Sequence, residues 1–166
     1  MSLEPHYLTA ARRQWLDQLA RRHPARRAIA LQAIWAVQYD WGYIPADAMD
    51  EIGEVVGITA AQVYELVSFY SMFRTNPVGR YVFSVCGTLS CAACGGEGLL
   101  GYLQDQLGIK AGEVTPDGLF SIETVMCLGA CCWAPAMLVN DILHVRLTRE
   151  KVDKILATCR AHAGSV

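Results

Sequence analysis

Residues 81–96 read YVFSVCGTLSCAACGG and residues 119–131 read LFSIETVMCLGAC. Both stretches begin with alternating residues rich in β-branched and aromatic types, which predicts strands over 81–86 and 119–126. A loop with glycine and cysteine residues follows each strand directly. Because functional loops are positioned by the rigid elements beside them, we expect the two sets of cysteines to meet at a common site.

The sequence around these strands predicts a β-α-β-β-α order for the second half of the chain. Apolar residues recur at helical spacing over 99–107 and again over 148–159. Thr-Pro-Asp-Gly at 115–118 is a turn sequence. Two further short strands are expected over 136–139 and 142–145, joined by a tight turn at Asn140-Asp141.

The first half of the chain is expected to be helical, because its apolar residues recur at intervals of three and four. Thr59-Ala-Ala-Gln62 has the spacing of a capping box. His23-Pro24 is expected to start a helix, with a cap followed by proline at the first helical position. The four expected helices run from Leu8 to Leu19, from Pro24 to Gly42, from Met49 to Gly57 and from Thr59 to Tyr70.

A break in the helical pattern at Asn76-Pro77-Val78-Gly79 divides the chain. We therefore predict an α+β protein with an N-terminal helical bundle domain over residues 1–78 and an α/β domain with a mixed sheet over residues 79–166. The length of 166 residues suits two small domains of this kind.

Charge and hydropathy narrow the functional classes. Lys and Arg total 14 against 16 Asp and Glu, and a formal charge of −2 argues against nucleic acid as a main partner. Residues 1–27 nevertheless hold six arginines and two acids, which we interpret as the solvated or partner-facing side of a helix. The uncharged run 124–140 contains Gly129 and Pro135 and is a poor membrane helix, so no membrane span is predicted.

The seven cysteines are the informative residues for chemistry. Their odd number favours metal binding or redox chemistry over disulfide pairing. Cys86-x4-Cys91 and Cys127-x3-Cys131 together offer two pairs of thiolates, and a 2Fe–2S cluster needs two on each iron. The cysteines stand at positions 86, 91, 94, 127, 131, 132 and 159.

Two other constellations remain open. Cys91-Ala-Ala-Cys94, after a strand and at the expected start of a helix, has the placement of a thioredoxin-type dithiol. The cysteines at 91, 94, 127 and 131 also have the ligand types of a zinc site. The cluster is favoured because it alone uses Cys86. Thr88 and Ser90, with neighbouring backbone amides, are candidate hydrogen-bond donors to the sulfur atoms of such a cluster.

Two motifs are expected to be misleading. The glycines at 96, 98 and 101 match the letters of a dinucleotide fingerprint, but they begin ten residues after Cys86 rather than at the end of a strand. Residues 47–73 imitate a helix-turn-helix, yet residues 60–70 contain Glu65 and no Lys or Arg, which a DNA-reading helix needs. No hydrolytic or acid–base arrangement stands out, so we expect no complete active site in this chain.

Several segments resemble the E subunit of NADH-quinone oxidoreductase, the thioredoxin-like 2Fe–2S ferredoxin of respiratory complex I. They are VYELVSFYSMF at 63–73, PVG at 77–79, GEVTPDG at 112–118, and CLGAC at 127–131 with Ala134-Pro135 after it. The resemblance implies a thioredoxin-like fold for the second domain. It also implies Cys86, Cys91, Cys127 and Cys131 as cluster ligands and places Cys94, Cys132 and Cys159 outside the family's pattern.

The resemblance further implies a setting for the chain. Its partners would be a larger flavoprotein subunit that holds FMN and the NADH site, and further iron–sulfur subunits. The cluster would exchange single electrons with that flavin, because the redox chemistry belongs to the cofactors. The expected location is cytoplasmic, in the hydrophilic arm of a complex peripheral to the membrane. Homologous subunits serve NAD-dependent hydrogenases and formate dehydrogenases, and the sequence does not separate these parent complexes.

Overall fold

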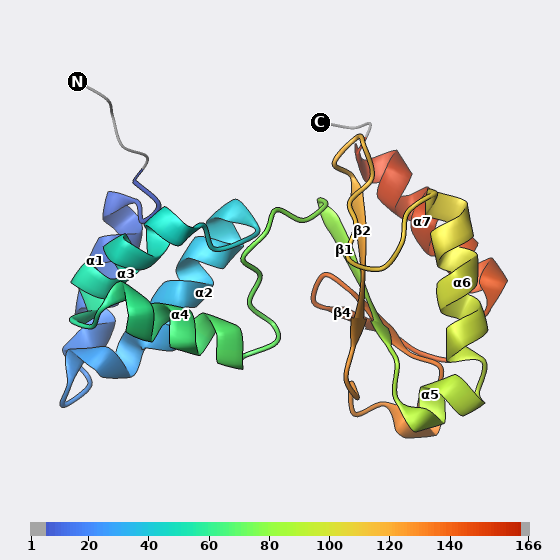
Figure 1. Ribbon diagram of the computed structural model, residues 1–166, viewed down its shortest axis with the longest axis horizontal. Helices are drawn as coiled ribbons and strands as arrows, with labels where there is room; N and C mark the ends of the chain where they lie inside the picture. The colour runs from blue at the N-terminus through green and yellow to red at the C-terminus, as the bar shows by residue number, and fades with distance from the viewer. Residues whose placement is uncertain (1–5, 164–166) are drawn as a thin grey trace. The chain divides into compact units, whose positions relative to one another are not determined.

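The computed structural model describes residues 6–163 of the chain, which forms two compact units, Met1–Pro77 and Val78–Val166 (Figure 1). The first unit is helical, and the second is built on a four-stranded sheet with helices packed against it. The predicted fold class, a helical bundle followed by an α/β domain with a mixed sheet, is confirmed.

The helical unit consists of α1 (Ala10–Ala20), the 3₁₀ turn η1 (Arg26–Ile29), α2 (Ala30–Trp41), α3 (Ala46–Val56) and α4 (Ala60–Phe69). Each α-helix turns an apolar stripe inward, so that Leu16, Ile34, Ile52 and Val63 are fully buried in one core. Burial of this stripe, rather than helix propensity, supplies most of the stability of such short helices.

Helix ends follow the expected chemistry except at one place. Thr59 and Gln62 form the predicted capping box at the start of α4. Gly57 ends α3 with φ 79°, a left-handed conformation that glycine adopts without strain. The prediction of a helix start at His23-Pro24 is wrong. The His23 amide instead donates to the Ala20 carbonyl in a turn after α1, and the next helical turn begins only at Arg26.

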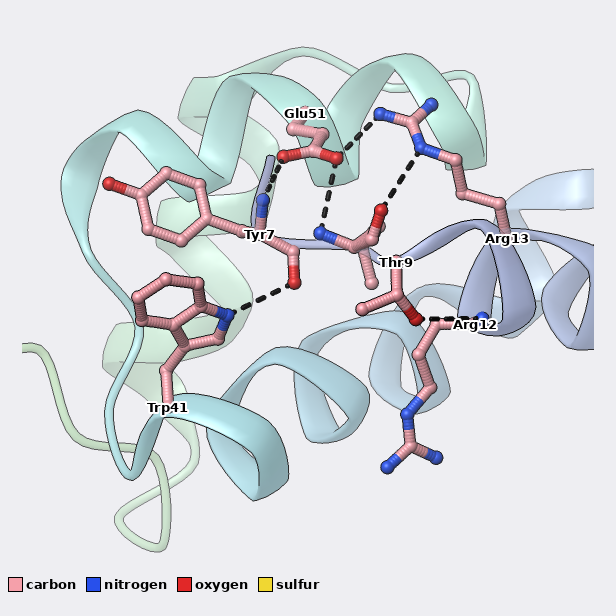
Figure 2. Close-up of polar contacts among 7 residues, drawn as sticks. Tyr7, Thr9, Arg12, Arg13, Trp41 and Glu51 are labelled. Carbon is pink, nitrogen blue, oxygen red and sulfur yellow. Dashed lines mark hydrogen bonds and ion pairs between the residues drawn. The ribbon is translucent and has the colours of Figure 1, made fainter. Parts of the chain in front are cut away.

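Glu51 on α3 ties the segment before α1 to the bundle (Figure 2). Its carboxylate accepts hydrogen bonds from the amides of Tyr7, at 2.7 Å, and Leu8, at 3.1 Å, and it pairs with Arg13. The indole of Trp41 at the end of α2 donates to the Tyr7 carbonyl at 3.1 Å. A single carboxylate therefore satisfies two backbone amides that precede the first helix.

The second unit has the sheet order β2-β1-β3-β4, formed by β1 (Tyr81–Cys86), β2 (Phe120–Val125), β3 (Met137–Val139) and β4 (Ile142–His144). β1 runs parallel to β2 and antiparallel to β3, and β3 runs antiparallel to β4. The helices α6 (Gly96–Leu107) and α7 (Arg149–Ala163) lie along one face of the sheet (Figure 1). Phe83, Ile122 and Met137 are buried in the core of this unit.

The helix start expected at Cys91-Ala-Ala-Cys94 belongs to a separate short helix, α5 (Leu89–Ala93), which lies between β1 and α6. Gly95, with φ 87°, separates it from α6. The helix expected from residue 99 begins three residues earlier, at Gly96. The glycines of the apparent dinucleotide fingerprint therefore lie within helix α6 and not in a loop after a strand.

The helices that imitate a DNA-binding motif, α3 and α4, are bent by 111° at the break between them. Among residues 6–163, no single helix is long and apolar enough to cross a bilayer, and these two meet the length and hydropathy criteria only as a bent pair.

Candidate metal centre

Parallel pairing of β1 and β2 brings two cysteine loops to one edge of the sheet. Cys86, the last residue of β1, lies opposite Val125, the last residue of β2. The Gly87 amide still donates to the Val125 carbonyl at 3.0 Å, so the strands stay joined to the point where the loops begin. The loop with Cys127 therefore starts beside the loop that follows Cys86.

Four thiols meet at this edge as two pairs. The thiols of Cys86 and Cys91 are close enough to shift each other's pKa, and the sulfur atoms of Cys127 and Cys131 lie 3.4 Å apart. Cys86 interacts electrostatically with both members of the second pair, and Cys91 with Cys131. Within residues 6–163, no three His, Cys, Asp or Glu side chains converge as the ligands of one metal ion do.

Cys86 and Cys91 form the buried pair. They are only 3% and 2% exposed and pack with Ala130 and Ala136 in a small apolar cluster separate from the main core. The Thr88 hydroxyl lies 3.2 Å from the Cys86 sulfur. Burial by itself raises the pKa of Cys86, but hydrogen bonds, those of Thr88 foremost, outweigh it and lower the pKa from 9.0 to about 7. Burial raises the pKa of Cys91.

Cys127 and Cys131 form the exposed pair. The Gly129 amide donates to the Cys127 sulfur at 3.4 Å, and this hydrogen bond lowers the pKa of Cys127. The hydrogen bond with Cys127 raises the pKa of Cys131, whose sulfur also interacts with the Ser90 side chain. Each pair therefore contains one thiol with a lowered pKa, and the thiolate is the form of cysteine that binds metal.

The sequence did not identify which backbone amides act on the thiols. The Leu128 amide lowers the pKa of Cys86 and the Ala136 amide that of Cys91, whereas the expected donors were Thr88, Ser90 and the amides near them. Amide donors have no side-chain signature, because every residue except proline carries one. The only available signal is Gly129, whose φ of 74° turns the loop around Cys127.

Two glycines allow close packing around the buried pair. A Cβ atom on Gly96 would lie 2.7 Å from the carbonyl oxygen of Cys91, and one on Gly87 would lie 2.7 Å from the Thr124 methyl group. The start of α6 thus rests directly on the backbone of Cys91. Gly96 is required by this contact and not by any phosphate.

The remaining three cysteines lie outside this group. Cys94 and Cys132 are exposed, and within the described part of the chain their thiols make no hydrogen bond to the four. Cys159 is buried on α7 in the core of the sheet unit. The Cys91–Cys94 dithiol and the zinc set both require Cys94, whose thiol is exposed and makes no hydrogen bond to the four thiols within residues 6–163.

The sheet topology and the two pairs of thiols together are those of a thioredoxin-like domain with a candidate cysteine metal centre. The family model for the thioredoxin-like [2Fe-2S] ferredoxins matches residues 16–160. The chain belongs to this family, as its sequence motifs indicated.

Curated relatives match over almost their full length. The E 2 subunit of the NADH-quinone oxidoreductase of Rhizobium meliloti is 40% identical over 90% of this chain and 89% of its own. NADH-quinone oxidoreductase subunit 2 of Thermus thermophilus is 41% identical over 90% of this chain and 84% of its own. The E subunit of the Escherichia coli NADH-quinone oxidoreductase is 33% identical over 92% of both chains.

A solved structure supports the fold. The air-oxidized NAD⁺-reducing [NiFe]-hydrogenase aligns with a TM-score of 0.69 over 78% of this chain and 23% of the hydrogenase chain. At 23% sequence identity, this likeness shows the fold alone.

Proposed function

We propose that this chain is the iron–sulfur subunit of an NADH-quinone oxidoreductase and carries one 2Fe–2S cluster on Cys86, Cys91, Cys127 and Cys131. The observation that carries the proposal is the meeting of these four thiols, two and two, where β1 and β2 end. Two thiolates on each iron is the ligand set of such a cluster. Membership of the ferredoxin family and the names of the curated relatives support the same function.

The residues around the thiols suit a bound cluster. Thiolates are soft ligands that favour iron–sulfur centres. The neighbours Ala130 and Ala136 are small and apolar, which lowers the local polarity around the buried pair. The hydroxyls of Thr88 and Ser90 and the amide of Gly129 contact sulfur, and donors of this kind raise or lower a reduction potential through the charge on sulfur. When bound, the cluster would take up and release one electron at a time.

One pair of thiols is buried and the other is exposed, so an electron partner would reach the cluster from the side of the exposed pair. Cys86 and Cys91 lie under the loops, whereas Cys127 and Cys131 face outward. We place the electron partner, the FMN of a larger NADH-binding subunit, on the side of the exposed pair. Further iron–sulfur subunits would complete the assembly, as a cytoplasmic arm peripheral to the membrane.

The visible absorption spectrum of protein purified without oxygen tests the cluster. We expect broad charge-transfer bands that bleach with dithionite. Cys127→Ser should perturb or remove these bands, whereas Cys159→Ser, which changes a thiol in the core of the same unit, should leave them unchanged. Identical behaviour of the two variants would show that the ligand assignment is wrong. A colourless protein that also fails reconstitution with iron and sulfide would overturn the cluster itself.

The parent complex has its own test, because the substrate chemistry lies in neighbouring subunits. Affinity purification of the intact complex should recover an FMN-containing, NADH-oxidising subunit together with quinone-reducing activity. Recovery of a nickel-containing or formate-oxidising subunit instead would assign the chain to an NAD-dependent hydrogenase or a formate dehydrogenase.

A further inference from the structure

The arginines at the start of the helical unit fall into two classes. Three of them form ion pairs with carboxylates of the same unit. In one of these, the Arg12 guanidinium lies 2.6 Å from a carboxylate oxygen of Asp40. These pairs hold α1 and η1 to the rest of the bundle. The three pairs are Arg12–Asp40, Arg13–Glu51 and Arg26–Asp17.

The other three, Arg21, Arg22 and Arg27, have guanidinium groups with no ion pair or hydrogen bond to any residue in the range 6–163. They lie within one exposed stretch, residues 21–28, that runs from the end of α1 through η1. Positive charges at neighbouring positions repel one another, so the charges of these three arginines do not stabilise the fold.

A groove of about 450 Å³ lies next to this stretch, between the η1–α2 junction and α4. Its lining includes the apolar side chains of Ala28, Ala30, Ile58 and Leu66. Arg27 lines it from the η1 side and Glu65 from the α4 side. An apolar floor inside a charged rim is the composition of a protein–protein contact.

We propose that this groove, which Arg27 lines and which lies next to the exposed stretch with Arg21 and Arg22, docks an acidic segment of a different protein chain. Aliphatic side chains of that segment would fill the groove, and its carboxylates would pair with the three arginines. Charge complementarity favours this occupant, because the three arginines lack partners among residues 6–163 while Arg12, Arg13 and Arg26 have them. The apolar floor supplies the burial that an exposed ion pair lacks.

A protein segment fits this surface better than an anionic membrane. A bilayer would bring its phosphates against Glu65 on the α4 side as well as against Arg27 on the other. The groove is concave and its lining contains no aromatic side chain, whereas membrane-surface contacts use convex faces with Trp or Phe. A narrow segment can enter the groove and place its acids on the arginine side only.

The docking proposal rests on one part of the proposed function, that the chain is a subunit of a larger complex, and does not depend on the cluster. A photo-crosslinking residue, p-benzoylphenylalanine, is placed at Glu65 in the chain as assembled in its complex. Tyr64, exposed on the same helix and not part of the groove lining, is the matched control position. We expect position 65, but not position 64, to crosslink to one segment of another subunit with more acidic than basic residues.

Several results would overturn the proposal. One is an adduct at position 65 with lipid, nucleic acid or a second copy of this chain. Another is an adduct with a protein segment that has no excess of acidic residues. The absence of any adduct would also overturn it. The visible spectrum of the same samples reports the cluster separately, so a failure of docking and a failure of the proposed function are distinguishable.

Charge reversal gives a quantitative test. The double variant Arg22→Glu with Arg27→Glu should raise the Kd for rejoining a complex prepared without this chain by about tenfold or more. Lys110→Glu with Lys154→Glu makes the same charge change on exposed residues of the sheet unit and should leave Kd within about twofold of the unsubstituted chain. Equal effects of the two double variants would contradict a specific contact at the groove.

Discussion

The two units of this protein satisfy their polar groups in different ways. In the helical unit, the Glu51 carboxylate is bound by two backbone amides and by Arg13, and Arg12 is bound by Asp40. In the sheet unit, a separate small cluster around Cys86 and Cys91 places polarisable thiols at the strand ends. At these contacts the charged groups of the helical unit are paired within the unit, whereas the sheet unit carries thiols that we propose bind a cluster. Substitutions should therefore separate stability from cofactor binding.

The largest effect is expected from Cys91→Ser. Loss of this cluster ligand should remove the visible bands entirely. It should also speed hydrogen exchange in the two cysteine loops, because the cluster that would join the two loops is no longer bound. Exchange in α1–α4 should stay unchanged. Hydrogen-exchange mass spectrometry and absorption spectroscopy measure both results, and Cys94→Ser is the control with an exposed thiol. Faster exchange throughout the helical unit would break the comparison.

Gly96→Ala should have the next largest effect. The added Cβ would lie 2.7 Å from the Cys91 carbonyl oxygen, and overpacking of this kind costs about 1–3 kcal/mol. Gly98→Ala, on the same helix with no atom within 4 Å of its Cβ, should instead stabilise the unit by up to about 1 kcal/mol, as alanine favours helix over glycine. Urea unfolding measures both. Similar free energies for the two variants would contradict the close contact at Cys91.

Glu51→Gln tests the helical unit alone. The variant keeps one acceptor but loses the charge that binds Arg13 and two amides, and we expect a loss of about 1–3 kcal/mol in the stability of this unit. The visible spectrum should not change. Glu54→Gln, at an exposed position on the same helix, serves as the control in thermal unfolding. A change in the cluster bands would show that the units are coupled.

The smallest effect is expected at the partly exposed Arg12–Asp40 pair. The hydrogen bond from Arg12 holds the pKa of Asp40 below its usual 3.8. A lowered folded-state pKa stabilises the protein above the unfolded pKa, and this contribution disappears as pH falls through the folded pKa. Asp40→Asn should therefore cost less than about 1 kcal/mol at neutral pH. The difference from the unsubstituted protein should vanish in acid. A constant difference across pH would contradict a role for the ion pair.

The sequence was most informative where local chemistry decides structure. The capping box at Thr59, the glycine end at Gly57 and the strand over 81–86 all follow from residue type and spacing. It failed at His23-Pro24, because the turn after α1 uses the His23 amide before a new helix can start. It also did not predict that α5 is a helix separate from α6, because five residues are too few for a periodic signal.

By itself, then, the sequence determined the α+β class, the strand-then-cysteine loops and the family, since these depend on local pattern. Only the tertiary structure brought the two cysteine loops together, because the parallel register of β1 and β2 sets Cys86 beside the loop of Cys127. It also decided which arginines are paired. Arg12 and Arg13 find Asp40 and Glu51 at separations of 28 and 38 residues, distances along the chain that only folding closes.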